Sequence, residues 1–79
     1  MKIKTIGSNQ TEIEFKTGIV VLVSYATPVA AFIPGKGIAR TETKHSATTS
    51  KHINKWITKN YPRATVTLTP QNFLADLIA

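Results

Sequence analysis

The segment IVVLVSY, residues 19–25, restricts the fold more than any other part of the sequence. Its apolar residues are consecutive rather than alternating, and most are β-branched, which is typical of a central strand that is apolar on both faces. The aliphatic run is also far too short to cross a lipid bilayer as a helix. We therefore expect a sheet built around this segment, and no membrane-spanning or secretion segment.

Alternation of apolar and polar residues predicts further strands on either side of the central one. These are residues 2–6, 11–16, 38–43 and 63–69, and the apolar segment VAAFI, residues 29–33, is expected to be another extended strand. The short segments GSNQ, TG and PGKG between them are typical of turns. Pro28 is expected to separate the central strand from residues 29–33, because a proline cannot donate a hydrogen bond to a neighbouring strand.

Helical periodicity appears in residues 48–60, where Ile53, Trp56 and Ile57 recur at spacings of three and four. This pattern predicts the main helix, with Trp56 buried against the sheet. The candidates for its N-terminal cap are Ser46, Thr48 and Thr49. Pro62 is expected to end it, because the residue before a proline disfavours helical geometry.

A short C-terminal helix is predicted at residues 70–78, with Thr69 as its cap and Pro70 in its first turn. Its apolar stripe consists of Phe73, Leu74, Leu77 and Ile78. The order of elements predicts a single α+β domain over residues 1–79. We expect a mostly antiparallel sheet of about five to six strands, with one face covered by helix.

The cations of the chain are concentrated in its second half. Residues 36–63 hold seven of the ten Lys and Arg residues but only Glu42 among the four carboxylates. Lys51, Lys55 and Lys59 fall on one arc of the main helix, where like charges four apart cost roughly 0.2–0.5 kcal/mol per pair. This arc is either an ordinary solvated face or a binding surface for an anionic partner.

Hydroxyl residues surround the start of the main helix, where free backbone N–H groups favour phosphate. One hydroxyl is enough for the cap, so the others are candidate phosphate contacts. We therefore list the following residues as predicted contacts for phosphate or a partner: Lys36, Arg40, Lys44, Ser46, Thr49, Ser50, Lys51, Lys55, Lys59 and Arg63.

Neither catalysis nor metal binding is expected. The chain has no cysteine, and His45 and His52 are seven residues apart without a nearby carboxylate, which does not fit a helical metal pair. His52 lies at the edge of the apolar helix face and is interpreted as a packed, hydrogen-bonded side chain. No carboxylate is placed to orient a serine–histidine pair. We expect no cofactor.

The aromatic residues favour backbone contact over base recognition. Phe15, Phe32, Trp56 and Phe73 fit core positions. The sequence does not place Tyr25 and Tyr61 in the core, and two tyrosines do not form a base-stacking platform. Any nucleic-acid ligand is therefore expected to be a duplex held by its phosphates.

The segments SYATPVAAF and TTSKHINKW, with the basic hairpin that has Lys36 at its tip (residues 29–43) between them, resemble a group of short proteins of tailed bacteriophages. The resemblance covers residues 23–57. No activity is assigned to that group, so no site residue can be transferred from it. It implies a small accessory protein in an infected bacterial cytoplasm, and it adds inhibitors of bacterial defence or host enzymes to the functions considered.

Two functions remain open from the sequence. The first is a non-enzymatic protein that binds nucleic-acid phosphates through the basic hairpin and helix face. The alternative is a protein-binding inhibitor whose cations meet an acidic surface of a bacterial enzyme. Both use electrostatic steering, so charge cannot separate them. An exposed sheet edge such as residues 2–6 is a possible contact between two copies of the chain.

Overall fold

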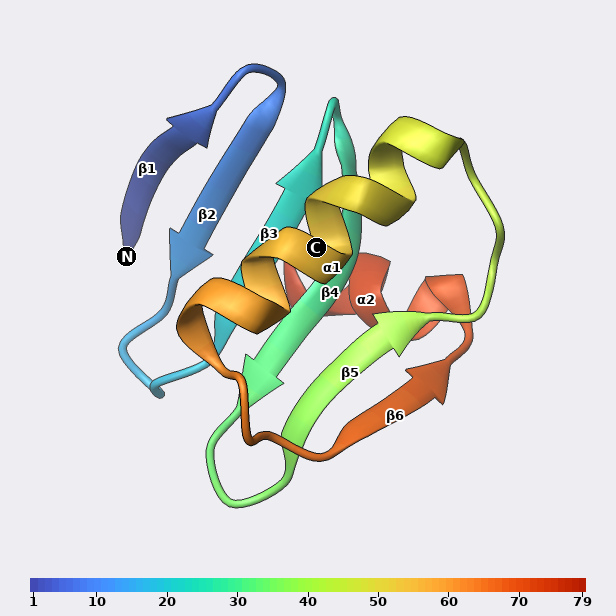
Figure 1. Cartoon of the computed structure of the whole chain (residues 1–79). Coiled ribbons are helices and arrows are strands. Elements are labelled where there is room, and N and C mark those ends of the chain that lie inside the picture. The colour runs from blue at the N-terminus through green and yellow to red at the C-terminus, as the bar shows by residue number, and fades with distance from the viewer.

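Six strands form one sheet whose spatial order is the order of the chain (Figure 1). The computed structural model describes residues 1–79. The strands are β1 (Lys2–Gly7), β2 (Gln10–Glu14), β3 (Val20–Ser24), β4 (Thr27–Ile33), β5 (Gly37–Thr41) and β6 (Val66–Thr69). The helices are α1 (Ala47–Asn60) and α2 (Gln71–Leu77). The predicted α+β class and both predicted helices are confirmed.

The first five strands are antiparallel, and β6 runs parallel to β5. Parallel neighbours need a long connection that returns the chain to the same end of the sheet. Helix α1 supplies this connection between β5 and β6. The sheet therefore has β1 and β6 as its two edges, and β3 and β4 at its centre.

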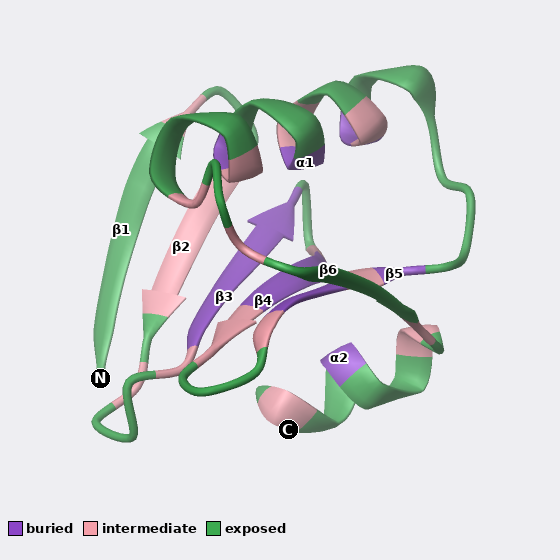
Figure 2. Cartoon of the chain, turned by 60° about the horizontal axis from the view of Figure 1, so that its bottom comes forward, coloured by how far each residue is buried: buried purple, intermediate pink, exposed green.

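The sheet is covered on both faces, whereas the sequence suggested helix cover on one (Figure 2). On one face, Leu22 and Ile38 pack with Ile53 and Trp56 of α1. On the other, Val21, Val23, Ala31 and Ala39 pack with Leu74 of α2. The physical reason lies in β3, whose five residues are all buried and would leave apolar surface in water if one face were uncovered.

Pro28 lies inside β4 instead of interrupting the sheet. Leu22 pairs with Ala30 while Val23 pairs with Pro28, so the register shifts there and Val29 is left as the extra residue of a bulge. A proline is tolerated next to a bulge and near the start of a strand, because no ladder hydrogen bond is lost there. Tyr25, with φ of 58°, makes the tight turn into β4.

Helix α1 begins one residue before the predicted start and ends at the predicted Asn60. The Ser46 hydroxyl accepts a hydrogen bond of 3.1 Å from the Thr49 N–H, which caps the helix, and Tyr61 follows its last residue. Trp56 is 2% exposed, which confirms its predicted burial. Neither helix is long and apolar enough to span a membrane.

Helix α2 differs from its prediction in its cap and its apolar stripe. Pro70 occupies the cap position without a side-chain hydrogen bond, while the Thr69 hydroxyl donates to the Arg40 carbonyl at 3.4 Å. Leu74 is fully buried, but Phe73 and Ile78 are 40% and 37% exposed, so the predicted core position of Phe73 is wrong. A helix of only two turns reaches the sheet with one row of side chains, and the neighbouring rows remain in water.

Candidate nucleic-acid interface

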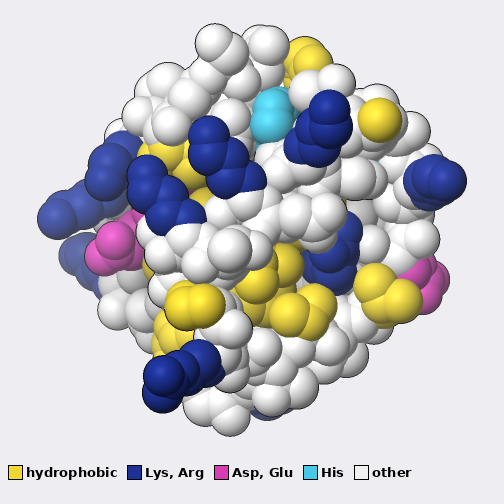
Figure 3. Space-filling model, in the orientation of Figure 1, with side chains coloured by type: hydrophobic (Ala, Val, Ile, Leu, Met, Phe, Trp, Pro, Cys, Tyr) yellow, Lys and Arg dark blue, Asp and Glu magenta, His cyan; other side chains and the backbone are white.

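The outer face of α1 is a row of lysines. Lys51, Lys55 and Lys59 are all exposed, one turn apart, while Ile53 and Trp56 of the same helix are buried against the sheet. The helix contains no carboxylate. In the orientation of Figure 1, Lys and Arg side chains spread across α1 and towards the β1–β2 hairpin (Figure 3). We call Lys51, Lys55 and Lys59 the lysine row.

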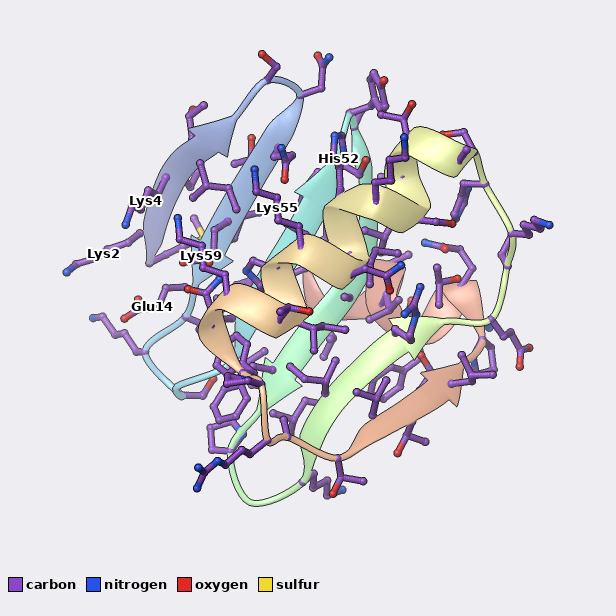
Figure 4. All side chains as sticks on the ribbon, viewed as in Figure 1. Lys2, Lys4, Glu14, His52, Lys55 and Lys59 are labelled. Atoms are coloured by element: carbon purple, nitrogen blue, oxygen red, sulfur yellow. The ribbon has the colours of Figure 1, made fainter.

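A polar groove of about 240 Å³ separates α1 from the β1–β2 hairpin. Lys55 and Lys59 contribute to its helical side, and Lys4 of β1 contributes to the opposite side. Its lining also includes Gln10, Glu12, Trp56 and Asn60. The labelled side chains in Figure 4 show Lys4, Lys55 and Lys59 on the same side of the molecule, with Lys2 and Glu14 beside them. We call this the lysine groove.

Strand register explains why β1 places its lysines beside α1. Lys4 pairs with Glu12, and Glu12 pairs with Leu22, whose side chain belongs to the core under α1. Residues that are directly opposite in a sheet point to the same face. Lys2 and Lys4 therefore share the face of α1, whereas Ile13, next to Glu12 in the chain, packs on the α2 side.

One carboxylate of the groove is held by the core. The indole N–H of Trp56 donates a hydrogen bond of 2.8 Å to Glu12 Oε2. Three lysines against this single carboxylate leave the lining with an excess of positive charge. Hydrogen bonding to Trp56 restrains Glu12 at the floor, while the ammonium groups sit on flexible, exposed stems.

Tyr61 continues the buried aromatic cluster beyond the end of α1. Its ring stacks on Phe32 with 4.6 Å between centroids and meets the edge of Trp56 at 5.1 Å. Burial raises the pKa of the Tyr61 hydroxyl above its ordinary value of 10.0, and the carboxylates of Glu12 and Glu14 raise it further. Tyr61 is half-buried, whereas Tyr25 is exposed.

Lys2 and Lys4 are not among the phosphate or partner contacts predicted from the sequence. The first third of the chain is nearly neutral, because its lysines are accompanied by Glu12 and Glu14. The available signal was the short GSNQ turn, which fixes Lys4 opposite Glu12. The position of α1 above this hairpin depends on tertiary packing, which local periodicity does not contain.

The predicted hydroxyl cluster is used mainly inside the fold. Thr49 is 5% exposed, and its hydroxyl lies 3.2 Å from those of both Ser24 and Ser46. Ser46 caps α1, and Ser50 is half-buried. Thr49 is therefore removed from the candidate phosphate contacts, because its side chain is enclosed and already hydrogen-bonded.

Both histidines have partners within the protein. His52 Nδ1 lies 2.8 Å from the Ser24 hydroxyl, as expected for a packed histidine at the edge of the helix face. His45 Nε2 lies 3.0 Å from Gln71 Oε1. Gln71 also accepts from the Thr41 hydroxyl and donates to the Pro28 carbonyl, so it joins α2 to the sheet. No three His, Cys, Asp or Glu side chains are grouped to hold a metal ion.

The remaining predicted cations do not share the lysine groove. Arg40 is half-buried and donates to Asn54 Oδ1 of α1 at 2.9 Å. Lys36, on the β4–β5 turn, borders a different pocket of about 160 Å³ that also includes Phe73. Lys44 is in the loop before α1, and Arg63 is in the segment after it. The structure thus places Lys36 apart from the lysine groove.

Sequence comparison assigns the chain to a family. It belongs to the Family of unknown function (DUF8033), whose model matches residues 1–73. This range includes all six strands, α1 and the lysine groove. The chain matches no curated protein and no solved structure.

Proposed function

We propose that the protein binds the phosphate backbone of nucleic acid, without catalysing a reaction, through the lysine row and the lysine groove. The observation that carries the proposal is the convergence of Lys4 with Lys55 and Lys59 from two distant parts of the chain. Lysines on two walls can neutralise neighbouring phosphates of one nucleic-acid backbone. If the lysine row were only an ordinary solvated helix face, there would be no reason for Lys4 to lie opposite it across the groove.

The position of the aromatic residues favours backbone contact. Trp56 is enclosed under α1, and Phe32 and Tyr61 stack on each other. Two aromatic side chains are exposed: Tyr25, at 55%, lies near His52, and Phe73, at 40%, is on α2 outside the lysine groove. Binding of single strands by stacking uses several aromatic rings among the cations. A duplex recognised through its phosphates fits this surface better.

A gel-retardation experiment with paired variants tests the proposal. The variant Lys55→Ala/Lys59→Ala removes two charges from the groove, and Lys36→Ala/Lys44→Ala removes the same charge elsewhere. All four side chains are exposed, so both variants should fold. We expect the first to lose most of its affinity for duplex DNA at low salt, and the second to remain close to the wild type. Lys4→Ala should weaken binding in the same direction as the first variant.

Two outcomes would contradict the proposal. Equal losses in both double variants would mean that net charge, rather than the groove, attracts the nucleic acid. No retardation of DNA or RNA at low salt would exclude phosphate binding. In that case an acidic protein surface, as in an inhibitor of a bacterial enzyme, becomes the partner to seek by pull-down from nuclease-treated lysate.

A further inference from the structure

The two edges of the sheet differ in how they are protected against pairing. Edge β1 carries Lys2 and Lys4 and has an irregular register near Gly7, and both features discourage the addition of another strand. Edge β6, Val66–Thr69, has no charged residue and no proline. Its two apolar side chains, Val66 and Leu68, are 44% and 63% exposed.

The backbone of β6 has hydrogen-bonding groups directed away from the sheet. The carbonyls of Thr65 and Thr69 accept from the N–H groups of Ile38 and Glu42, each at 2.8 Å. Because successive residues of a strand direct their polar groups to opposite sides, the N–H and C=O of Val66 and Leu68 face outward. The free edge therefore presents two residues with unpaired donors and acceptors.

We propose that β6 pairs in antiparallel orientation with β6 of a second copy of this chain, around a two-fold axis at Thr67. In this register each Val66 lies opposite Leu68 of the second copy, and the pair exchanges both backbone hydrogen bonds. Thr67 lies opposite its own counterpart as the non-hydrogen-bonded pair. Pro70, which has no N–H, ends the ladder just beyond Thr69.

Side-chain chemistry identifies a second copy as the occupant. The register centred on Thr67 gives the longest ladder between two copies of β6. It places aliphatic residues opposite aliphatic residues on the α1 side, and threonine opposite threonine on the α2 side. Such pairs stabilise antiparallel strands, and no like charges face each other. The interface is self-complementary, as a two-fold contact between identical chains requires. This inference does not depend on nucleic-acid binding.

The symmetry also places both α1 helices on the same side. A two-fold axis perpendicular to a sheet preserves its faces, so α1 of each copy covers the same face of a continuous twelve-stranded sheet (six strands in each copy). Figure 1 shows β6 at the edge of the molecule, with α1 on the viewer's side of the sheet. The two lysine rows would consequently be displayed on one surface of the dimer.

Disulfide trapping tests the two-fold position. The chain has no cysteine, so Thr67→Cys introduces a single thiol at the proposed axis. The Cβ atoms of a non-hydrogen-bonded pair are about 4.5–5.5 Å apart, close enough for a bridge after small adjustments. We expect rapid formation of a covalent dimer on mild oxidation. Thr5→Cys, an exposed position on the other edge strand, is the matched control and should crosslink slowly.

Sedimentation of charge variants tests the register. Leu68→Lys should dissociate the dimer, whereas Ile3→Lys, at a residue of similar exposure on β1, should leave it intact. Val66→Lys and Leu68→Glu should each be monomeric alone, but mixing them should restore a dimer by placing lysine opposite glutamate. Fluorescence of Trp56 and circular dichroism would establish that each variant is folded.

The expected combination is a wild-type dimer, its loss in Leu68→Lys and its recovery in the mixture. Two results would overturn the proposal. One is a wild-type chain that stays monomeric at high concentration and a Thr67→Cys variant that crosslinks no faster than Thr5→Cys. The other is a dimer that Leu68→Lys and Ile3→Lys affect equally. Either result would leave the β6 edge to a strand of another protein.

Discussion

The indole N–H of Trp56 donates a hydrogen bond of 2.8 Å to Glu12 Oε2, and this contact joins α1 to strand β2. A buried indole N–H without an acceptor destabilises a fold, because it has lost its hydrogen bonds to water. Glu12 provides the acceptor and is held at the floor of the lysine groove by the same bond. One interaction therefore serves both the core and the candidate interface.

Replacement of Glu12 should separate these two effects. Glu12→Gln retains an oxygen that can accept from Trp56, so the free energy of unfolding should change little. Glu12→Ala leaves the indole N–H without its partner and should cost about 1–3 kcal/mol. Both variants remove a negative charge from the groove and should bind duplex DNA more tightly. Chemical denaturation followed by Trp56 fluorescence measures the first effect; equal midpoints for Glu12→Ala and the wild type would contradict the role given to the bond.

Tyr61 should make stability depend on pH in the alkaline range. Its pKa is raised in the folded state, first by burial and then by Glu12 and Glu14. Below its ordinary value of 10.0, the hydroxyl is protonated in both folded and unfolded chains and contributes no pH dependence. Above that value the unfolded chain releases the proton first, so the free energy of unfolding falls until the folded pKa is passed.

The variant Tyr61→Phe isolates this contribution. It retains the ring that stacks on Phe32. Because it has no hydroxyl to ionise, its free energy of unfolding should fall less above pH 10 than that of the wild type. Tyr25→Phe leaves Tyr61 as the single tyrosine, so its ionisation can be followed by tyrosinate absorbance. An ordinary pKa for Tyr61 in that variant, or an identical alkaline profile in Tyr61→Phe, would contradict the expected burial effect.

Local patterns in the sequence were sufficient to predict the elements of the fold. Alternation identified the outer strands, consecutive apolar residues identified β3 and β4, and the spacing of Ile53, Trp56 and Ile57 identified both α1 and its buried face. The parallel partner of β6 was not predictable in the same way. Its residues alternate like those of an antiparallel strand, and its place beside β5 follows from the path of α1 over the sheet.

Only the helical side of the lysine groove was predictable from the sequence. Periodicity placed Lys55 and Lys59 on the exposed side of α1, but it contained no information on what lies beside them. Lys4 reaches the groove because the β1–β2 register and the packing of Trp56 on Glu12 bring two distant segments together. The hydroxyls at the start of α1 were predicted as phosphate contacts, but tertiary packing that the local sequence does not contain encloses Thr49. Its hydroxyl contacts Ser24 of β3 and the capping residue Ser46.

The hydroxyls at the start of α1 should therefore influence stability rather than binding. Ser46→Ala removes the N-terminal cap and should cost about 0.5–2 kcal/mol. Thr49→Val removes a buried hydrogen-bonding group and should cost about 1 kcal/mol, since Ser24 retains His52 as a partner. Thermal denaturation measures both losses. Under conditions where the variants are folded, their affinity for duplex DNA should equal that of the wild type; a weaker affinity would restore these hydroxyls as phosphate contacts.

The salt dependence of the affinity for duplex DNA should report how many phosphates the surface neutralises. Each phosphate that the protein neutralises contributes about −0.9 to the slope of log affinity against log salt for duplex DNA, because its condensed counterions are released. If Lys4 and the three lysines of the row each neutralise one phosphate, the slope should be about −3.6 per protein chain. Binding should be nearly independent of base sequence, because phosphate contacts carry no direct sequence information.

Replacing Lys51, Lys55 and Lys59 together with Ala should reduce the slope by up to about three. The fold should persist, and α1 should gain roughly 0.2–0.5 kcal/mol for each like-charge pair that is removed. Fluorescence anisotropy over a range of salt concentrations measures the slope, and denaturation measures stability. An unchanged slope in this triple variant, with binding retained, would move the phosphate contacts away from α1. A reduction confined to one base sequence would instead indicate base recognition, which phosphate contacts from a lysine row do not provide.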